Sequence, residues 1–122
     1  MNTIHGFDVQ LVTQKAMPYD CLDDHRIIGD TLVVKIVDQE NDLYNRLLLI
    51  HALVEHTVAQ MTGVTDSQID GFDMNYQGDG EPGDDVDAPY RDAHCLGVAV
   101  ERMICAHLHV PYTQYEKDIM VP

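Results

Sequence analysis

A histidine and a glutamate stand in the most apolar stretch of the chain. His51 and Glu55 are four residues apart, with Leu53, Val54 and Val58 as close neighbours in the sequence. On a helix this spacing places both side chains on one face, one turn apart. A carboxylate among aliphatic neighbours is costly to bury unless a cation or several hydrogen-bond donors compensate it. The two residues are therefore candidate ligands for a cation.

A second apolar stretch repeats the arrangement, because His94 and Glu101 lie seven residues apart, which is two helical turns. Facing helices that each contribute one histidine and one glutamate would supply two nitrogens and two oxygens, as in metal sites in the cores of helical bundles. That set suits zinc or another divalent transition metal, with bonds of about 2.0–2.2 Å. We therefore predict a metal site formed by His51, Glu55, His94 and Glu101. A structural interpretation is also open, in which each pair hydrogen-bonds internally and to Tyr90.

Two long helices are expected to position these side chains. Residues 41–62 contain no glycine or proline, apolar residues recur every three or four positions, and Gly63 supplies a typical stop. Pro89 suits the first turn of another helix, which is expected to end near His107. Shorter helical segments are expected after Asp66 or Ser67 and around residues 112–117.

The N-terminal part of the chain is expected to form strands. Residues 7–13 alternate partly between apolar and polar side chains, and residues 31–37 are rich in β-branched side chains after a turn at Gly29 and Asp30. A hairpin alone would be marginally stable, so the strands must pack on the helices. The prediction is an α+β fold, with a small antiparallel β-sheet packed on about three α-helices in a single domain, residues 1–122. The expected loops are residues 16–26 and 78–87.

The charge balance excludes two classes of partner. The chain has 122 residues, with 21 acidic and 7 basic side chains and a formal net charge of −14. Direct binding of nucleic acid needs clustered lysine and arginine, and anionic membrane surfaces attract basic segments. We therefore expect neither a nucleic acid nor a membrane as partner, which leaves another protein, a small-molecule ligand or another copy of the chain.

Processing signals and cysteines indicate a cytoplasmic setting. No apolar run approaches the roughly 18–20 residues that span a bilayer, and the N-terminus lacks the basic start and apolar core of a signal peptide. Of the three cysteines, Cys95 and Cys105 are expected on one helix, about 15 Å apart and beyond disulfide reach. At least one thiol must then remain unpaired, which is typical of a reducing compartment.

The helix with His51 resembles those of zinc peptidases but lacks their general base. The zincin pattern His-Glu-x-x-His places a glutamate next to the first histidine, and Ala52 stands there. The inverted pattern His-x-x-Glu-His would need one residue fewer than separates His51 from His56. If the protein is a hydrolase, Glu101 or an aspartate of residues 79–87 would have to activate the water.

Several short motifs together resemble one group of proteins. They are residues 49–55, Gly71-Phe72-Asp73, Pro82-Gly83-Asp84-Asp85, and Ala88-Pro89-Tyr90 with His94. They are similar to small phage and prophage proteins of unassigned function, whose central helix commonly reads His-Glu-Leu-x-Glu. The similarity covers about residues 30–118. It implies a phage product that acts inside a bacterial cell, and it selects by position His51, Glu55, Asp84 or Asp85, Tyr90 and His94.

Two classes of function are compatible with these observations. The first is a metal-centred protein, either a hydrolase of a small phosphorylated or amide substrate or a structural metal holder. The second is a non-enzymatic acidic binder that antagonises a host factor, by mimicking DNA or by sequestering a host ligand. A DNA mimic should spread its acids along one face, whereas six acids here concentrate between Asp79 and Asp92. This distribution favours the metal-centred class.

Overall fold

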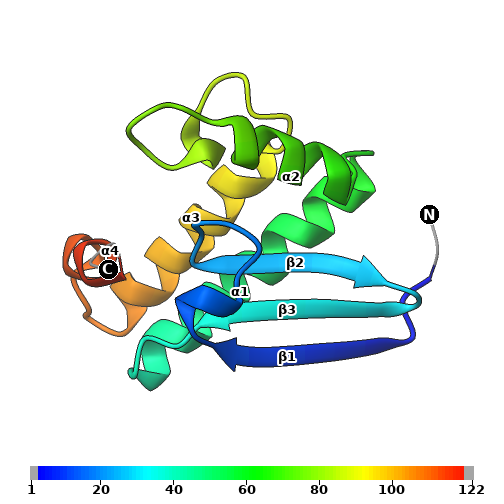
Figure 1. The fold of residues 1–122 in the computed structure, drawn as a ribbon. Coiled ribbons are helices and arrows are strands. Elements are labelled where there is room, and N and C mark those ends of the chain that lie inside the picture. The colour runs from blue at the N-terminus through cyan, green and yellow to red at the C-terminus, as the bar shows by residue number, and fades with distance from the viewer. Residues whose placement is uncertain (1–2, 120–122) are drawn as a thin grey trace.

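The computed structural model describes residues 3–119 and has an α+β fold, which confirms the expected class. A three-stranded sheet is covered on one face by α1, and α3 packs along α1 on the side away from the sheet (Figure 1). The helix α2 lies beside β2, the strand at one edge of the sheet, and α4 follows α3. In chain order the elements are β1 (Gly6–Val12), the 3-10 turn η1 (Gln14–Ala16), β2 (Asp23–Ile28), β3 (Thr31–Val37), α1 (Asp42–Met61), α2 (Asp66–Asn75), the 3-10 turn η2 (Pro82–Asp84), α3 (Arg91–His107) and α4 (Tyr112–Ile119).

The sheet is mixed rather than wholly antiparallel, which corrects one detail of the prediction. The strand order is β1-β3-β2, with β2 and β3 antiparallel and β1 parallel to β3. The β2–β3 hairpin turns at Gly29, whose φ of +66° is in the left-handed region that glycine adopts readily. Residues 13–22 connect β1 to β2 and are long enough to leave a strand position between them, which β3 then fills.

The strand β2 begins earlier than the sequence pattern predicts. Residues 16–26 were expected to be a loop, but β2 starts at Asp23 and places His25 opposite Val34 of the central strand. The acidic run that suggested a loop is accommodated because Arg26 Nε donates to Asp24 at 2.8 Å and Arg26 Nη2 donates to it at 2.7 Å. A charge-assisted pair of this kind allows the Asp24 side chain to be buried within a strand. His25, which is in register with the buried Val34, points to the covered face of the sheet and lies inside the molecule.

The main core lies between β3 and the helices. Alternate residues of β3 (Leu32, Val34 and Ile36) are buried against α1, as the two-residue period of a strand requires. The other buried members of this core are Leu47, Leu48, Ala52, Cys105, Tyr115 and Ile119. The helix α1 therefore presents one stripe to the sheet and leaves another for α3.

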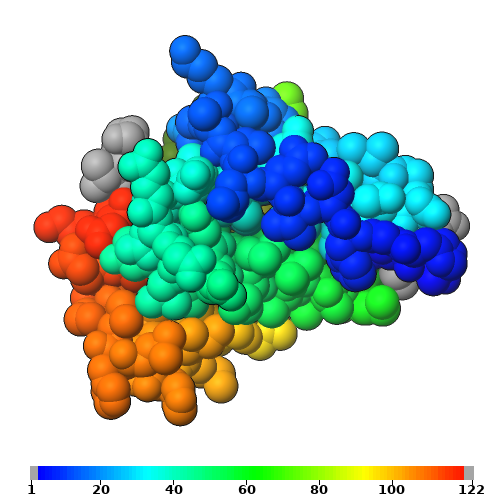
Figure 2. Space-filling model, turned by 90° about the horizontal axis from the view of Figure 1, so that it is seen from below, coloured from blue at the N-terminus to red at the C-terminus, as the bar shows by residue number. Residues whose placement is uncertain are grey.

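The edge strand β1 is not covered in the same way. Phe7, Val9 and Leu11 are paired in register with buried residues of β3 but are 70%, 47% and 54% exposed. In the view from below, β1 and α1 both reach the surface (Figure 2). The packed part of the sheet is thus formed by β2 and β3, which carry the residues that approach α1.

The helix boundaries follow local capping chemistry. Asn41 caps α1 by accepting from the backbone N–H of Tyr44 at 3.0 Å, and Gly63 follows its end with a φ of +84°. The cap of α2 is Thr65 rather than Asp66 or Ser67, because Thr65 and Gln68 form a reciprocal capping box. The side chain of Asp66 is consequently free to turn toward the interior.

The helices and the cysteines bear on two expectations from the sequence, that no segment spans a membrane and that at least one thiol is unpaired. Within residues 3–119, no single helix is long and apolar enough to cross a membrane. The helices α1 and α2 pass that test of length and composition only when taken together, and the chain bends by 117° between them. Cys21, Cys95 and Cys105 are all free thiols, and Cys95 and Cys105 share α3 as predicted.

Candidate metal centre

Two glycines allow histidines to pack closely against neighbouring elements. A Cβ atom added at Gly97 of α3 would lie 2.7 Å from His51 Nδ1, so a glycine is needed where α3 passes this ring. A Cβ atom at Gly83 of η2 would lie 2.5 Å from His94 Cγ. The close approach of backbone to ring at both positions fixes where the two imidazoles can lie.

His51, Glu55 and His94 converge between α1 and α3, as the sequence predicts. His51 Nε2 is 2.9 Å from Glu55 Oε2, and His94 Nδ1 is 3.1 Å from the same oxygen. The two rings meet edge to face with centroids 4.9 Å apart. All three side chains are at most 8% exposed, and one ligand atom from each lies within 4.8 Å of the others. These residues, here called the His51 trio, are close enough to hold a metal ion.

Glu101 lies at the other nitrogen of His51 and does not join this trio. Its Oε1 is 2.5 Å from His51 Nδ1, and its Oε2 accepts a hydrogen bond from Tyr115 at 2.6 Å. The structure therefore differs from the predicted four-ligand shell, because Glu101 and Glu55 approach opposite sides of one imidazole. In this position Glu101 orients the His51 ring.

The acidic loop contacts the outer nitrogen of His94. Glu81 Oε2 and Asp84 Oδ1 are each 3.2 Å from His94 Nε2. Asp84 is thus the member of the predicted Asp84/Asp85 pair that approaches the site. The Asp85 side chain instead accepts from the backbone N–H of Asp87 at 2.8 Å. Glu81 was expected only as part of an acidic loop, and no spacing rule connects it to His94.

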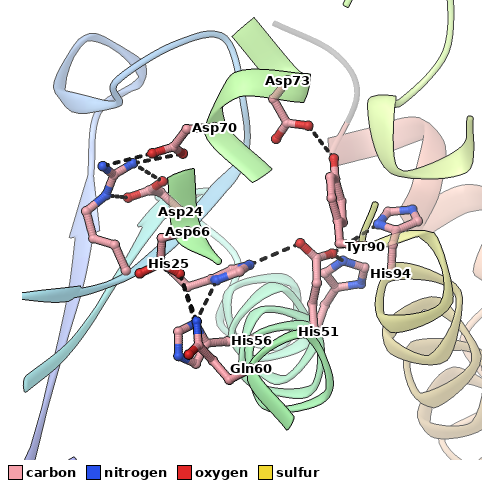
Figure 3. A network of polar contacts seen from close by, with 12 residues as sticks. Asp24, His25, His51, His56, Gln60, Asp66, Asp70, Asp73, Tyr90 and His94 are labelled. Atoms are coloured by element: carbon pink, nitrogen blue, oxygen red, sulfur yellow. Dashed lines mark hydrogen bonds and ion pairs between the residues drawn. The ribbon is translucent and has the colours of Figure 1, made fainter. Parts of the chain in front are cut away.

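Tyr90, predicted from the resemblance, lies beside the site without reaching its ligand atoms. Its ring packs edge to face against His94 with centroids 6.4 Å apart, and its hydroxyl donates to Asp73 (Figure 3). Asp73 also accepts from Tyr19 at 3.1 Å. Tyr90 therefore connects α2 with the start of α3, where His94 is located.

Two further histidines, His25 and His56, extend the network. His25 Nε2 is 3.0 Å from Glu55 Oε1, and His25 Nδ1 is 3.0 Å from His56 Nδ1 (Figure 3). The loop prediction for residues 16–26 concealed His25. His56 had one detectable signal, since Ala52 and Ala59 flank it at helical spacing and leave room for a buried ring on that face.

The electrostatics of the cluster are those of a carboxylate surrounded by imidazoles. Burial alone would raise the pKa of Glu55, but hydrogen bonds to three histidines outweigh it and hold the pKa well below its usual range. Burial would lower the pKa of His94, yet its contacts with Glu55 and Glu81 raise the pKa to about 10. Similar contacts raise the pKa of His51 well above its usual value. Without a metal, protons on the imidazoles balance the buried negative charge.

The same donor set can bind a cation in place of those protons. Histidine nitrogen and carboxylate oxygen are common ligands of zinc and of other divalent transition metals. Metal ligation needs neutral imidazoles, so the ion must compete with protons for these nitrogens. The cluster is therefore chemically suited to metal binding coupled to proton release.

The chain matches no protein-family model, and no similar protein was found among curated sequences or solved structures. Its function has to be inferred from the residues of the site itself.

Replacing Gly97 by alanine is expected to destabilise the protein by about 1–3 kcal/mol, because the new methyl group would overlap the buried His51 ring. Gly71→Ala is the matched control, since it is also a helix glycine but has no atom within 4 Å of the added Cβ. That variant should gain about 0.5–1 kcal/mol from helix propensity. Urea unfolding measures both, and equal effects of the two substitutions would contradict the close packing at His51.

The metal-free protein is expected to lose stability as the pH rises from about 6.5 toward 10. His94 has a pKa of about 10 in the folded chain against an ordinary 6.5. When folding raises the pKa of a group, the protonated group stabilises the folded state fully at pH values below its pKa in the unfolded chain. This contribution is lost as the pH rises through its pKa in the folded chain. The contribution of Glu55 depends on pH in the opposite direction. Folding lowers its pKa, so its contribution to stability is present above about pH 4.5 and is lost on acidification.

Urea midpoints in the presence of a chelator should therefore be highest at about pH 5–6.5, since both contributions are present there. A midpoint that increased steadily up to about pH 10 would contradict the protonated His94–Glu55 interaction.

Proposed function

We propose that the protein binds a divalent transition metal ion of the zinc class between α1 and α3, through His51, Glu55 and His94. The observation that carries the proposal is the convergence of two imidazoles and one carboxylate in the interior, with ligand atoms within 4.8 Å of one another. Two helices distant in sequence contribute to the set, so helical spacing alone does not account for it.

The distances in the His51 trio are close to those between ligands of one tetrahedral ion. Bonds of about 2.0–2.1 Å place neighbouring ligand atoms about 3.3 Å apart. The two nitrogen–oxygen distances are 2.9 and 3.1 Å, so the atoms need to separate by only a few tenths of an ångström. Side-chain rotation is sufficient for a change of this size.

The outer contacts of both histidines support the same assignment. A histidine that binds a metal through one nitrogen usually donates its other N–H to a carboxylate, which fixes the tautomer and the ring orientation. His51 has Glu101 at its other nitrogen, and His94 has Glu81 and Asp84. Each proposed histidine ligand thus has a carboxylate oxygen close to its second nitrogen, where a metal-binding histidine usually has its outer partner.

The number of protein ligands favours a more specific second candidate, a metal-dependent hydrolase. Zinc sites with three protein ligands keep a fourth position for water, whereas structural sites have four. Glu81 contacts His94 Nε2, on the side of the ring away from the proposed ion. In this mechanism the ion would polarise a bound water molecule, and Glu81 would orient the His94 ring and raise its basicity from the outer nitrogen.

Protein purified without added metal or an affinity tag is expected to contain bound zinc or a related ion. His51→Ala and His94→Ala should each lower the metal content by about one equivalent, because each removes one of three ligands. His107→Ala, an exposed histidine of the same helix as His94, should leave it unchanged. A chelator should lower the melting temperature by several degrees. Unchanged metal content in His94→Ala would refute the proposal.

If the protein is a hydrolase, Glu81→Gln should lose about 10–100-fold in turnover of activated ester or phosphate substrates, as expected for loss of an outer partner of a metal-binding histidine. Asp84→Asn is the matched control, because it neutralises the other carboxylate at His94 Nε2. Equal turnover by Glu81→Gln and the unsubstituted protein would exclude this role for Glu81.

A further inference from the structure

A second group of potential ligands lies where β2, α1 and α2 meet. His25 comes from β2, His56 from α1, and Asp66 from the first turn of α2 (Figure 3). One ligand atom from each lies within 4.8 Å of the others. The two imidazole side chains are only 4% and 2% exposed. These residues, here called the His56 trio, share no member with the His51 trio.

We propose that the His56 trio binds a second divalent transition metal ion of the zinc class, and that Glu55 connects this ion to the first. The ligand set is again two nitrogens and one carboxylate oxygen, which selects borderline metals over calcium or magnesium. Binding of the second ion does not require the proposed function to hold, whereas its connection to the first ion does.

The spacing of the His56 trio combines one hydrogen-bond distance with one longer approach, and direct hydrogen bonding accounts only for the first. His25 Nδ1 and His56 Nδ1 are 3.0 Å apart, and His56 Nδ1 is 3.9 Å from Asp66 Oδ1. The second distance is too long for a hydrogen bond. The two distances lie on either side of the roughly 3.3 Å expected between ligands of a tetrahedral ion. A shared ion would therefore account for the approach of all three groups.

The hydrogen bond between His25 and Glu55 prepares one ligand. An ionised carboxylate only accepts hydrogen bonds, so the proton of a neutral His25 must be on Nε2, which faces Glu55 Oε1 at 3.0 Å. The Nδ1 atom of His25 then presents a lone pair toward His56 Nδ1, where the proposed ion would lie. This carboxylate–histidine arrangement is the one that orients metal-binding imidazoles in proteins.

Asp66 is prepared in a comparable way. Its Oδ2 accepts from the backbone N–H of Ile27 at 2.9 Å, and its Oδ1 accepts from the Gln60 side chain at 3.3 Å. These contacts hold the carboxylate against β2 and α1. Because a carboxylate oxygen has more than one lone pair, Oδ1 can bind an ion while it keeps the contact with Gln60.

Glu55 links the two proposed ions through its two oxygens. Oε2 faces the nitrogens of the His51 trio, and Oε1 faces His25 of the His56 trio. The carboxylate would be a ligand of the first ion and an outer partner of the second. Together the ions would join β2, α1, α2 and α3, so Glu55 is the residue through which occupancy of one site influences the other.

The test is the zinc stoichiometry of the purified chain, measured by native mass spectrometry and elemental analysis during titration with zinc alone. The unsubstituted protein should bind two equivalents. His56→Gln and Asp66→Asn should each bind one, because each removes a ligand of the second ion. His107→Gln is the matched control at an exposed position and should bind two. Asparagine at position 66 keeps an oxygen for the Ile27 N–H, so this variant should remain folded.

The outcomes separate the two proposals. One equivalent that His94→Ala removes and His56→Gln retains would overturn the second ion and leave the first. One equivalent that His56→Gln removes and His94→Ala retains would overturn the first ion and leave the second ion. Two equivalents in both His56→Gln and Asp66→Asn would overturn the His56 trio as a site, and no bound zinc would overturn both. The ring nitrogen NMR shifts of His25 and His56 give the same answer without substitution, because they must change with the second equivalent.

Discussion

The buried carboxylate of Glu55 is the interaction on which the rest of the interior depends. It is 6% exposed and lies between aliphatic residues, where an uncompensated negative charge would be strongly unfavourable. Three imidazoles contact it, and each comes from a different element: His25 from β2, His51 from α1 and His94 from α3. The arrangement of these elements is therefore constrained by the need to bring positive charge, from protons or metal, to one point.

Much of the local backbone serves this requirement. Gly97 and Gly83 remove side chains that would overlap the His51 and His94 rings, and the capping of α2 by Thr65 leaves the neighbouring Asp66 free to contact β2. The acidic loop, which as a sequence reads as a solvated segment, brings Glu81 to His94. The acidic composition is thus connected with the interior, since carboxylates contact His25, His51 and His94.

The long helices and the convergence of His51, Glu55 and His94 followed from helical spacing and from the unfavourable burial of a carboxylate. Glu101 did not, because a residue seven positions from His94 shares its helical stripe yet meets the opposite nitrogen of His51. His25 was hidden by its acidic neighbours, whose charge is balanced within the strand by Arg26. The parallel pairing of β1 was equally hidden, because strand order depends on contacts between segments that are distant in sequence.

The sequence by itself determined the α+β class, the acidic character, the two central helices and the faces that carry their histidines, since these depend on composition and on local periodicity. Only the tertiary structure decided which atoms of those side chains meet. It placed one nitrogen of His51 and one of His94 at Glu55 and their other nitrogens beside outer carboxylates, and it placed His25, His56 and Asp66 together from three elements. Periodicity defines the direction of a side chain around its own helix or strand. The distance to a side chain on another element is set by how the elements pack.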